Sequence, residues 1–171
     1  MNRHKKGTVC KNPNGGTWCG PAVITVLTGK RYDIVEKDLL KTENKRRANS
    51  GKWNPFTGRR TPNKPIKEIT GLRTRSVKDA LRSYNYDVLS TYSILMEYGH
   101  HTNETFRQWT KRTHGKRGKY WFLIVVTGHF MVVKGNKVWD TYTPVEGSTI
   151  KKLRYYKRSK MEGVYIVKRK R

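Results

Sequence analysis

Residues 119–143, KYWFLIVVTGHFMVVKGNKVWDTYT, decide the fold. The run over 119–133 is apolar and is interrupted only by the Thr-Gly pair at 127–128, which is typical of a central strand. A turn is predicted at 134–136, and 137–143 then predicts a strand that returns beside the first. This region is therefore expected to form the centre of an antiparallel sheet.

Helical spacing predominates before this region. A helix is predicted from Cys19, with Pro21 in its first turn and Gly29 as its stop; its apolar face is Ala22, Val23, Val26 and Leu27. A second is predicted over about 32–41, beginning near Asp33, with the face Ile34, Val35, Leu39 and Leu40. Thr74 is expected to cap a third, with the face Val77, Ala80, Leu81 and Tyr84, and Thr102 or Asn103 to begin a fourth.

Extended segments are predicted at 86–94 and 163–170. Helices that come first and an antiparallel sheet that follows define an α+β fold. We expect a basic arm at 1–16, a single domain over 17–168 and a basic tail at 169–171, since 171 residues suffice for one core.

The charge is strongly one-sided. The chain has 38 Lys and Arg against 12 Asp and Glu, a formal charge of +26. A small domain needs a net charge of only about 2–8 for solubility, so nucleic acid or a nucleic-acid-rich particle is the expected partner. The alternative is that the Lys and Arg side chains are spread evenly over the surface and only keep the protein soluble.

Residues 42–69 are predicted to form a long basic loop, in which Trp53 and Phe56 lie among cationic side chains. Aromatic and basic residues together suit base stacking and phosphate contact, whereas the alternative is that both aromatics anchor the loop to the body. The candidate nucleic-acid-binding residues are Arg46, Arg47, Lys52, Arg59, Arg60 and Lys64.

Three residues suggest thiol chemistry. Cys19 precedes a predicted helix, where a helix N-terminus and a nearby imidazole lower a thiol pKa. If the turn centres on 135–136, facing residue numbers sum to roughly 271, which makes Asp140 the diagonal neighbour of His129. Each residue also has a purely structural interpretation: a buried cysteine, a core histidine and a turn aspartate.

WCGPA at a helix start, followed by GHFMVVKGNKVWDT, resembles the papain-like cysteine peptidase superfamily. The similarity covers most of residues 15–145 and is greatest to bacteriocin-processing-type peptidases and small papain-like proteins of tailed bacteriophages. The resemblance implies N-terminal helices packed on a C-terminal antiparallel sheet. It also implies Cys19 as nucleophile, His129 as general base and acid, and Asp140 as the residue that orients His129.

Two details depart from that family or leave a choice open. The family places a Gln upstream of its cysteine as an oxyanion donor, but residues 13–18 read PNGGTW. Asn14 or Asn12 and the backbone N–H of Cys19 are the remaining candidates. Asn136 is a second candidate for the orienting role, although it falls in the predicted turn.

Two functions therefore compete. One is a cysteine hydrolase that acts on a peptide or isopeptide bond of a protein or peptide substrate; the other is a catalytically silent papain-like protein of a phage particle that binds nucleic acid or other virion proteins. A pure RNA-binding module accounts for the charge but leaves the cysteine and histidine motifs unexplained.

The remaining expectations concern the surroundings of the chain. No apolar segment reaches the length of a membrane span, and no secretory signal is recognised, so we expect host cytoplasm or a virion and no membrane partner. We therefore expect Cys10 and Cys19 to be reduced, with a disulfide between them as the alternative. No metal and no cofactor are predicted.

Overall fold

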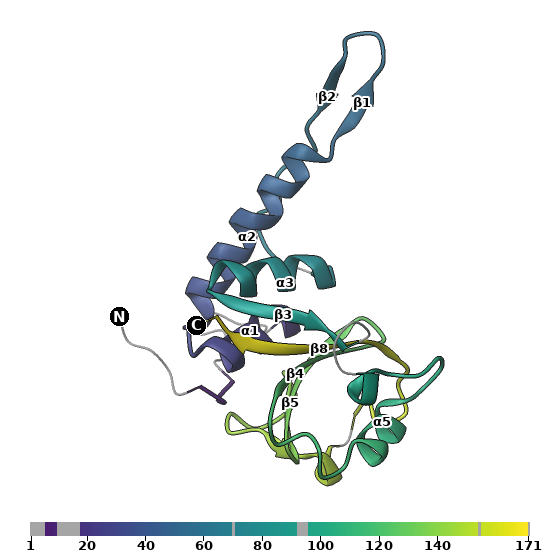
Figure 1. Ribbon diagram of the computed structural model, residues 1–171. Helices are drawn as coiled ribbons and strands as arrows, with labels where there is room; N and C mark the ends of the chain where they lie inside the picture. Colours follow the sequence, from purple (N-terminus) through teal and green to yellow (C-terminus); the bar gives the residue numbers. More distant parts are fainter. Residues whose placement is uncertain (1–5, 10–17, 70, 92–95, 154, 171) are drawn as a thin grey trace.

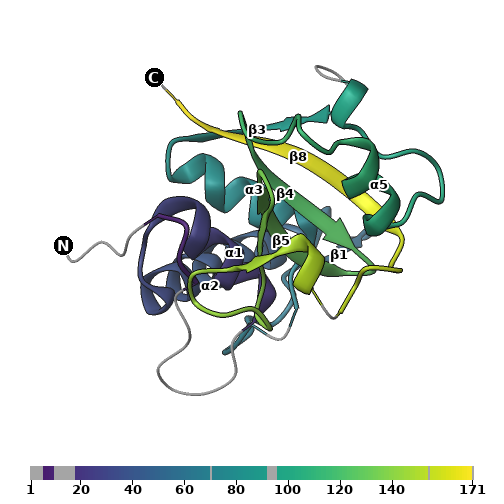
Figure 2. The ribbon, with the colours of Figure 1, turned by 90° about the horizontal axis from the view of Figure 1, so that it is seen from below.

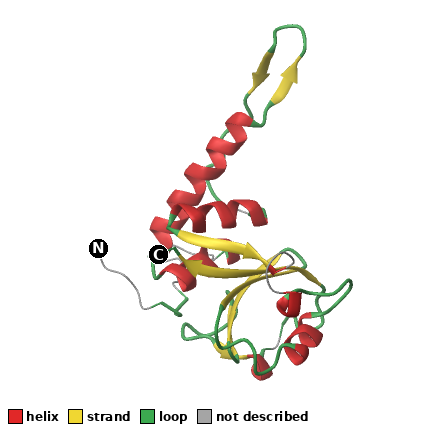
Figure 3. Cartoon of the chain, viewed as in Figure 1, coloured by secondary structure: helices red, strands yellow, loops and turns green. Residues whose placement is uncertain are grey.

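The computed structural model describes residues 6–9, 18–69, 71–91, 96–153 and 155–170. Helices α1, α2 and α3 gather on one side, and an antiparallel sheet occupies the rest of the body (Figure 1). Coloured by secondary structure, the strands of the main sheet lie between this helical group and further short helical segments on the other side (Figure 3). The α+β prediction is therefore confirmed.

Helix α1 (Cys19–Thr28) is the centre of the helical layer. It is covered on all sides, with every residue from 20 to 27 buried. Gly29 ends the helix in the left-handed region, with φ of 72°, and its N–H donates to the carbonyl of Thr25. The start and the stop of this helix are as the sequence predicts.

Helix α2 (Tyr32–Asn49) and helix α3 (Thr74–Ser83) pack beside α1. The buried stripe of α2 is Tyr32, Val35, Leu39 and Glu43, which repeats every three or four residues. Ile34 lies off this stripe and is exposed, so its predicted place on the buried face is wrong. The N-cap of α3 is Arg73 rather than Thr74.

The main sheet has the strand order β3-β8-β4-β5-β6-β7, and all neighbours are antiparallel. Its strands are β3 (Tyr86–Ser90), β4 (Trp121–Val126), β5 (His129–Lys134), β6 (Lys137–Trp139), β7 (Ser148–Thr149) and β8 (Met161–Arg169). Short 3-10 turns, η1 (Met96–Tyr98) and η2 (Ile150–Lys152), interrupt the connections.

The apolar run over 119–133 is two strands, not one. Thr127 and Gly128 have φ of 45° and 72°, which is the backbone of a two-residue hairpin turn. Val126 therefore pairs with His129, and β5 runs back along β4. In a continuous strand these residues would follow one another along a single line. In the hairpin, the residues of β4 and β5 lie side by side instead, and His129 is the first residue of β5.

The next hairpin has the register that the sequence predicts. Val132 pairs with Trp139 and Val133 with Val138, so paired numbers sum to 271. The ladder ends at Trp139, and Asp140 is the first residue beyond it.

Each face of the sheet supports its own core. One joins the inner faces of α1, α2 and α3 to Leu123, Val125, Phe130 and Val132; the other lies on the opposite face, over Ile124, Val126, Met131 and Val133. Helix α5 (Phe106–Arg112) covers this second face, away from the other helices (Figure 2). Its N-cap is Thr105, held by a capping box with Gln108, rather than the predicted Thr102 or Asn103.

Residues 42–69 are not a continuous loop. Helix α2 continues to Asn49, because Glu43 is buried and extends the inner stripe by another turn. The hairpin of β1 (Lys52–Asn54) and β2 (Arg59–Thr61) follows and projects from the body at the end of α2 (Figure 1).

The two predicted basic ends are partly built into the fold. Within 1–16, the structure describes residues 6–9, where the Gly7 N–H donates to Val26 and Val9 is buried in the first core. At the other end, β8 extends through Arg169, where it pairs with Tyr86. In the described part of the chain, none of the helices combines the length and apolar character that a bilayer span requires.

Candidate active site

Cys19 is the first residue of α1, and Trp18 is the N-cap. A helix begins with unsatisfied N–H groups and the positive end of its dipole, so a negative charge is favoured there. The backbone N–H groups of Gly20 and Phe130 act on the Cys19 sulfur and favour its charged form, which lowers its pKa. Pairing of β5 with β6 reaches only Val132, which leaves the Phe130 N–H for this contact.

The thiol of Cys19 is free and half-buried. Burial raises the pKa of a thiol, because desolvation disfavours the charged form. Hydrogen bonds with the His129 side chain and the Phe130 backbone, together with the charge of His129, outweigh burial, so the pKa of Cys19 lies below its ordinary value. Cys19 forms no disulfide among the described residues, and Cys10, the other cysteine expected to be reduced, lies outside them.

His129 lies between Cys19 and Asp140. Its Nε2 faces Oδ2 of Asp140 at 3.6 Å, with side-chain exposures of 10% and 0%. Within the described part of the chain neither of these two atoms makes a hydrogen bond. Buried polar atoms are normally paired, so the two atoms are candidates to interact with each other. Because Nε2 faces Asp140 and makes no hydrogen bond among the described residues, we assign the interaction of His129 with Cys19 to the other ring nitrogen, Nδ1.

Burial lowers the pKa of a histidine, but here the carboxylate of Asp140 and the side chain of Cys19 outweigh burial and raise the pKa of His129 to about 9. A cysteine with a lowered pKa and a histidine with a raised one favour the thiolate–imidazolium form of the pair. This is the charge state of an activated sulfur nucleophile.

The loop after β6 holds Asp140 in place. Oδ1 accepts the backbone N–H of Tyr142 at 2.9 Å, and the backbone N–H of Asp140 donates to Thr143 Oγ1 at 3.0 Å. One carboxylate oxygen therefore fixes the turn and the other faces the histidine. The purely structural interpretation of Asp140, as a turn residue, accounts for its contacts in the turn but not for the carboxylate oxygen that faces His129.

Tyr156 stacks on the ring of His129, with ring centroids 4.2 Å apart and planes 8° from parallel. Tyr142 lies beside both rings. Sequence reasoning missed these two residues, because Tyr156 lies 27 positions from His129 and stands at φ of 61°, which no local pattern encodes. The density of tyrosines at 142, 155 and 156 was the one available signal.

The oxyanion candidates have different outcomes. The backbone N–H of Cys19 lies at the beginning of α1, where it has no acceptor within the helix. Asn14 and Asn12 lie outside the described residues. Asn136 is excluded as the orienting residue, because it lies in the β5–β6 turn, at the opposite end of β5 from His129.

The six candidate nucleic-acid-binding residues are brought together on the projecting segment, away from Cys19. Three of them donate to internal partners in the described part of the chain: Arg46 pairs with Glu43, Arg47 Nε donates to the Lys64 carbonyl at 3.0 Å, and Arg60 Nη1 donates to the Gly51 carbonyl at 3.2 Å. Lys52 and Arg59 are exposed in the hairpin strands. In the part of the chain that the structure describes, no three His, Cys, Asp or Glu side chains lie close enough together to hold a metal ion.

Comparisons of the chain with protein-family models, with curated proteins and with solved structures find no match.

Proposed function

We propose that this protein is a papain-like cysteine hydrolase that cleaves a peptide or isopeptide bond. The observation that supports this most is the order Cys19, His129, Asp140 in space: a half-buried thiol at a helix N-terminus, an imidazole beside it, and a buried carboxylate 3.6 Å from that imidazole. A buried carboxylate facing a histidine is costly unless the histidine carries charge, and a thiolate beside it supplies the reason for that charge.

The proposed reaction has two halves. The Cys19 thiolate attacks the carbonyl carbon, and the developing oxyanion faces the N–H of Cys19. His129 gives its proton to the leaving amine as the carbon–nitrogen bond breaks, which leaves a thioester on Cys19. A water then attacks the thioester, His129 takes its proton, and the carboxylic acid departs as the sulfur returns to the thiolate.

Asp140 and Tyr156 act through the histidine. Asp140 faces the ring nitrogen Nε2 and favours the imidazolium by its charge. Tyr156 covers one face of the ring and limits its rotation. Neither residue needs to touch the substrate.

Two pockets lie next to Tyr142 and Tyr156 and suit the side chains of an extended substrate. One, of about 340 Å³, is lined by Tyr142, Thr143, Pro144, Ser148, Lys152, Leu153 and Tyr155. The other, of about 460 Å³, is lined by Arg107, Tyr156, Lys157, Arg158 and Ser159. No residue of the projecting hairpin lines either pocket.

The alternative is a silent papain-like scaffold of a phage particle, and the test separates the two without a known peptide. Purified protein with Cys10→Ser is mixed with p-nitrophenyl acetate, and both p-nitrophenol release and the mass of the chain are followed. A hydrolase gives a burst, one acetyl group on Cys19 and continuing turnover; His129→Ala slows both halves and Cys19→Ser abolishes them. Acetylation that is unaffected by His129→Ala, or that never turns over, indicates the scaffold.

A companion measurement is the iodoacetamide alkylation rate of Cys19 against pH in the same background. We expect an apparent pKa below the ordinary value of about 8.5, and a rise when His129 is replaced by Ala. An apparent pKa that the replacement leaves unmoved would contradict the proposed thiolate–imidazolium pair.

A further inference from the structure

The projecting segment, residues 44–67, is called the arm. It contains the end of α2, the β1–β2 hairpin and the chain that returns to the body (Figure 1). It has no Asp or Glu, and its cationic residues are Lys45, Arg46, Arg47, Lys52, Arg59, Arg60, Lys64 and Lys67. They are distributed along its whole length rather than gathered at one end.

The arm is braced along its base. The Asn44 side chain both donates to and accepts from the backbone of Ile66, at 3.0 and 2.8 Å. Asn63 Nδ2 donates to the Ser50 carbonyl at 3.2 Å. At Gly51 the strands approach so closely that a Cβ atom would lie 1.7 Å from the Thr61 carbonyl oxygen. The hairpin is thus held in one direction before any partner binds.

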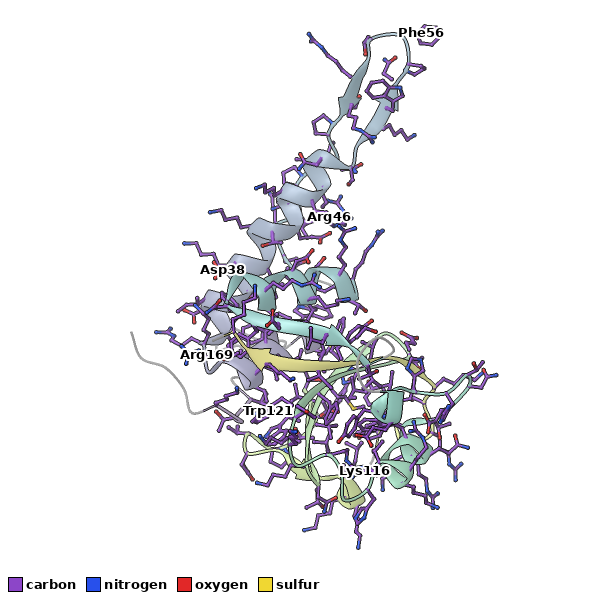
Figure 4. All side chains as sticks on the ribbon, in the orientation of Figure 1. Asp38, Arg46, Phe56, Lys116, Trp121 and Arg169 are labelled. Atoms are coloured by element: carbon purple, nitrogen blue, oxygen red, sulfur yellow. The ribbon has the colours of Figure 1, made fainter. Side chains whose placement is uncertain are left out.

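The tip of the arm presents an uncovered aromatic ring. Phe56 is 96% exposed, and Figure 4 shows it at the far end of the hairpin. The Asn54 side chain accepts the backbone N–H groups of Phe56 and Thr57, at 2.9 and 3.3 Å, and so fixes the turn that holds the ring outward. Trp53 is 56% exposed, and the Arg60 guanidinium lies over its ring at 5.9 Å.

These exposures exclude the interpretation in which the two aromatics anchor the segment to the body. A fixed, fully exposed phenyl ring at the end of a cationic ribbon calls for a partner that is both anionic and able to receive an apolar wedge. Duplex nucleic acid has both properties: a groove admits a two-stranded ribbon, the phosphates flank it, and base steps accept apolar side chains.

We propose that the arm is a double-stranded nucleic-acid-binding element. The β1–β2 ribbon lies in a groove, the cationic side chains contact phosphates along both edges, and Phe56 inserts against a base step. This inference does not depend on the proposed hydrolase function, because the arm contributes nothing to the contacts of Cys19, His129 or Asp140.

The test uses the full chain and a fluorescein-labelled 20-bp DNA duplex, with binding followed by anisotropy at several salt concentrations. Lys52→Gln with Arg59→Gln removes two charges that are exposed on the strands of the hairpin. The matched control is Lys119→Gln with Lys137→Gln, which removes two exposed charges from the body. The arm pair is expected to reduce the slope of log K against log salt by about 1.8, and the control pair by nearly nothing.

Phe56→Ala tests the wedge separately. It is expected to weaken duplex binding by roughly 10-fold at fixed salt while leaving the slope unchanged, and Phe56→Trp is expected to restore binding. Circular dichroism checks that each variant is folded, and Cys19 alkylation is expected to be the same in all of them.

Three results would overturn the proposal. Equal effects of the arm and control pairs would mean that the whole +26 surface binds without an arm-specific contact. A Phe56→Ala variant that binds like the parent would remove the wedge. Tight binding to single strands or to anionic phospholipid vesicles, with none to the duplex, would assign the arm to another partner. Loss of Cys19 reactivity with intact arm binding would instead count only against the hydrolase.

Discussion

Replacement of Asp140 by Asn is the sharpest probe of the site. Asn keeps an oxygen that accepts the Tyr142 N–H, so the turn is preserved, but it removes the negative charge that faces His129. The raised pKa of His129, about 9, is then expected to fall toward its ordinary value. An Ala replacement would be less informative, because it would release the turn as well.

The magnitude follows from the geometry. Unit charges 3.6 Å apart interact by about 4.6 kcal/mol at an effective dielectric constant of about 20. In the Asn variant the amide oxygen stays with the Tyr142 N–H, so the NH₂ group faces Nε2 and keeps none of this attraction. The Cys19 side chain still raises the pKa of His129, so we expect the fall to be about 2 pKa units, or about 2.7 kcal/mol. The His129 midpoint should move from about 9 to about 7.

The assay is the titration of the His129 Cε1–H resonance by NMR, assigned by its absence in His129→Ala. Asp79→Asn is the control, since Asp79 is a carboxylate on α3 that pairs with Arg82 at the surface. It is expected to leave the midpoint unchanged. A shift below about half a unit in Asp140→Asn would refute the inference that the two side chains are coupled.

Tyr156→Ala removes the ring that stacks on His129. Beyond the loss that comes from the buried area of the ring, we expect the lost stacking to lower the free energy of unfolding in urea denaturation by about 0.5–1.5 kcal/mol, whereas Tyr156→Phe should stay close to the parent. Buried Glu43 accepts hydrogen bonds from Arg46 and Ser76, and these lower its pKa despite burial. Its stabilising effect is present above about pH 4.3 and is lost as the pH falls through the folded-state pKa. Glu43→Gln should therefore lower the free energy of unfolding by about 1–3 kcal/mol at pH 7 and by much less at pH 3, and equal losses at both would contradict the ion pair.

The helical layer shows how far periodicity reaches. The α1 face is read correctly because Ala22, Val23, Val26 and Leu27 repeat at helical spacing, and all four are buried. The end of α2 was missed because its inner stripe continues through Glu43, a residue that is buried only with an arginine and a serine as partners. A charged residue at a core position is indistinguishable from a surface residue until its partners are placed.

Part of the candidate site is likewise predictable from the sequence, and part is not. The β5–β6 register follows from the turn alone, so the proximity of His129 and Asp140 is predictable from the sequence. The positions of Tyr156 and of the Phe130 N–H are not predictable in this way. Tyr156 comes from the long connection after β7, and the Phe130 N–H is left unpaired because the β5–β6 ladder ends before it.

What the sequence determined by itself is therefore local: the α+β class, the helix that begins at Cys19, the hairpin register and the excess of positive charge. These depend on periods of two or about four residues and on turn chemistry, which act over a few positions. Only the resemblance, and no local pattern, led us to expect that Cys19 meets His129. The tertiary structure alone decided that Tyr156 covers the imidazole and that Phe56 stands uncovered at the end of an arm. Burial and exposure are properties of the packed chain, because each depends on which distant segments arrive to cover a side chain.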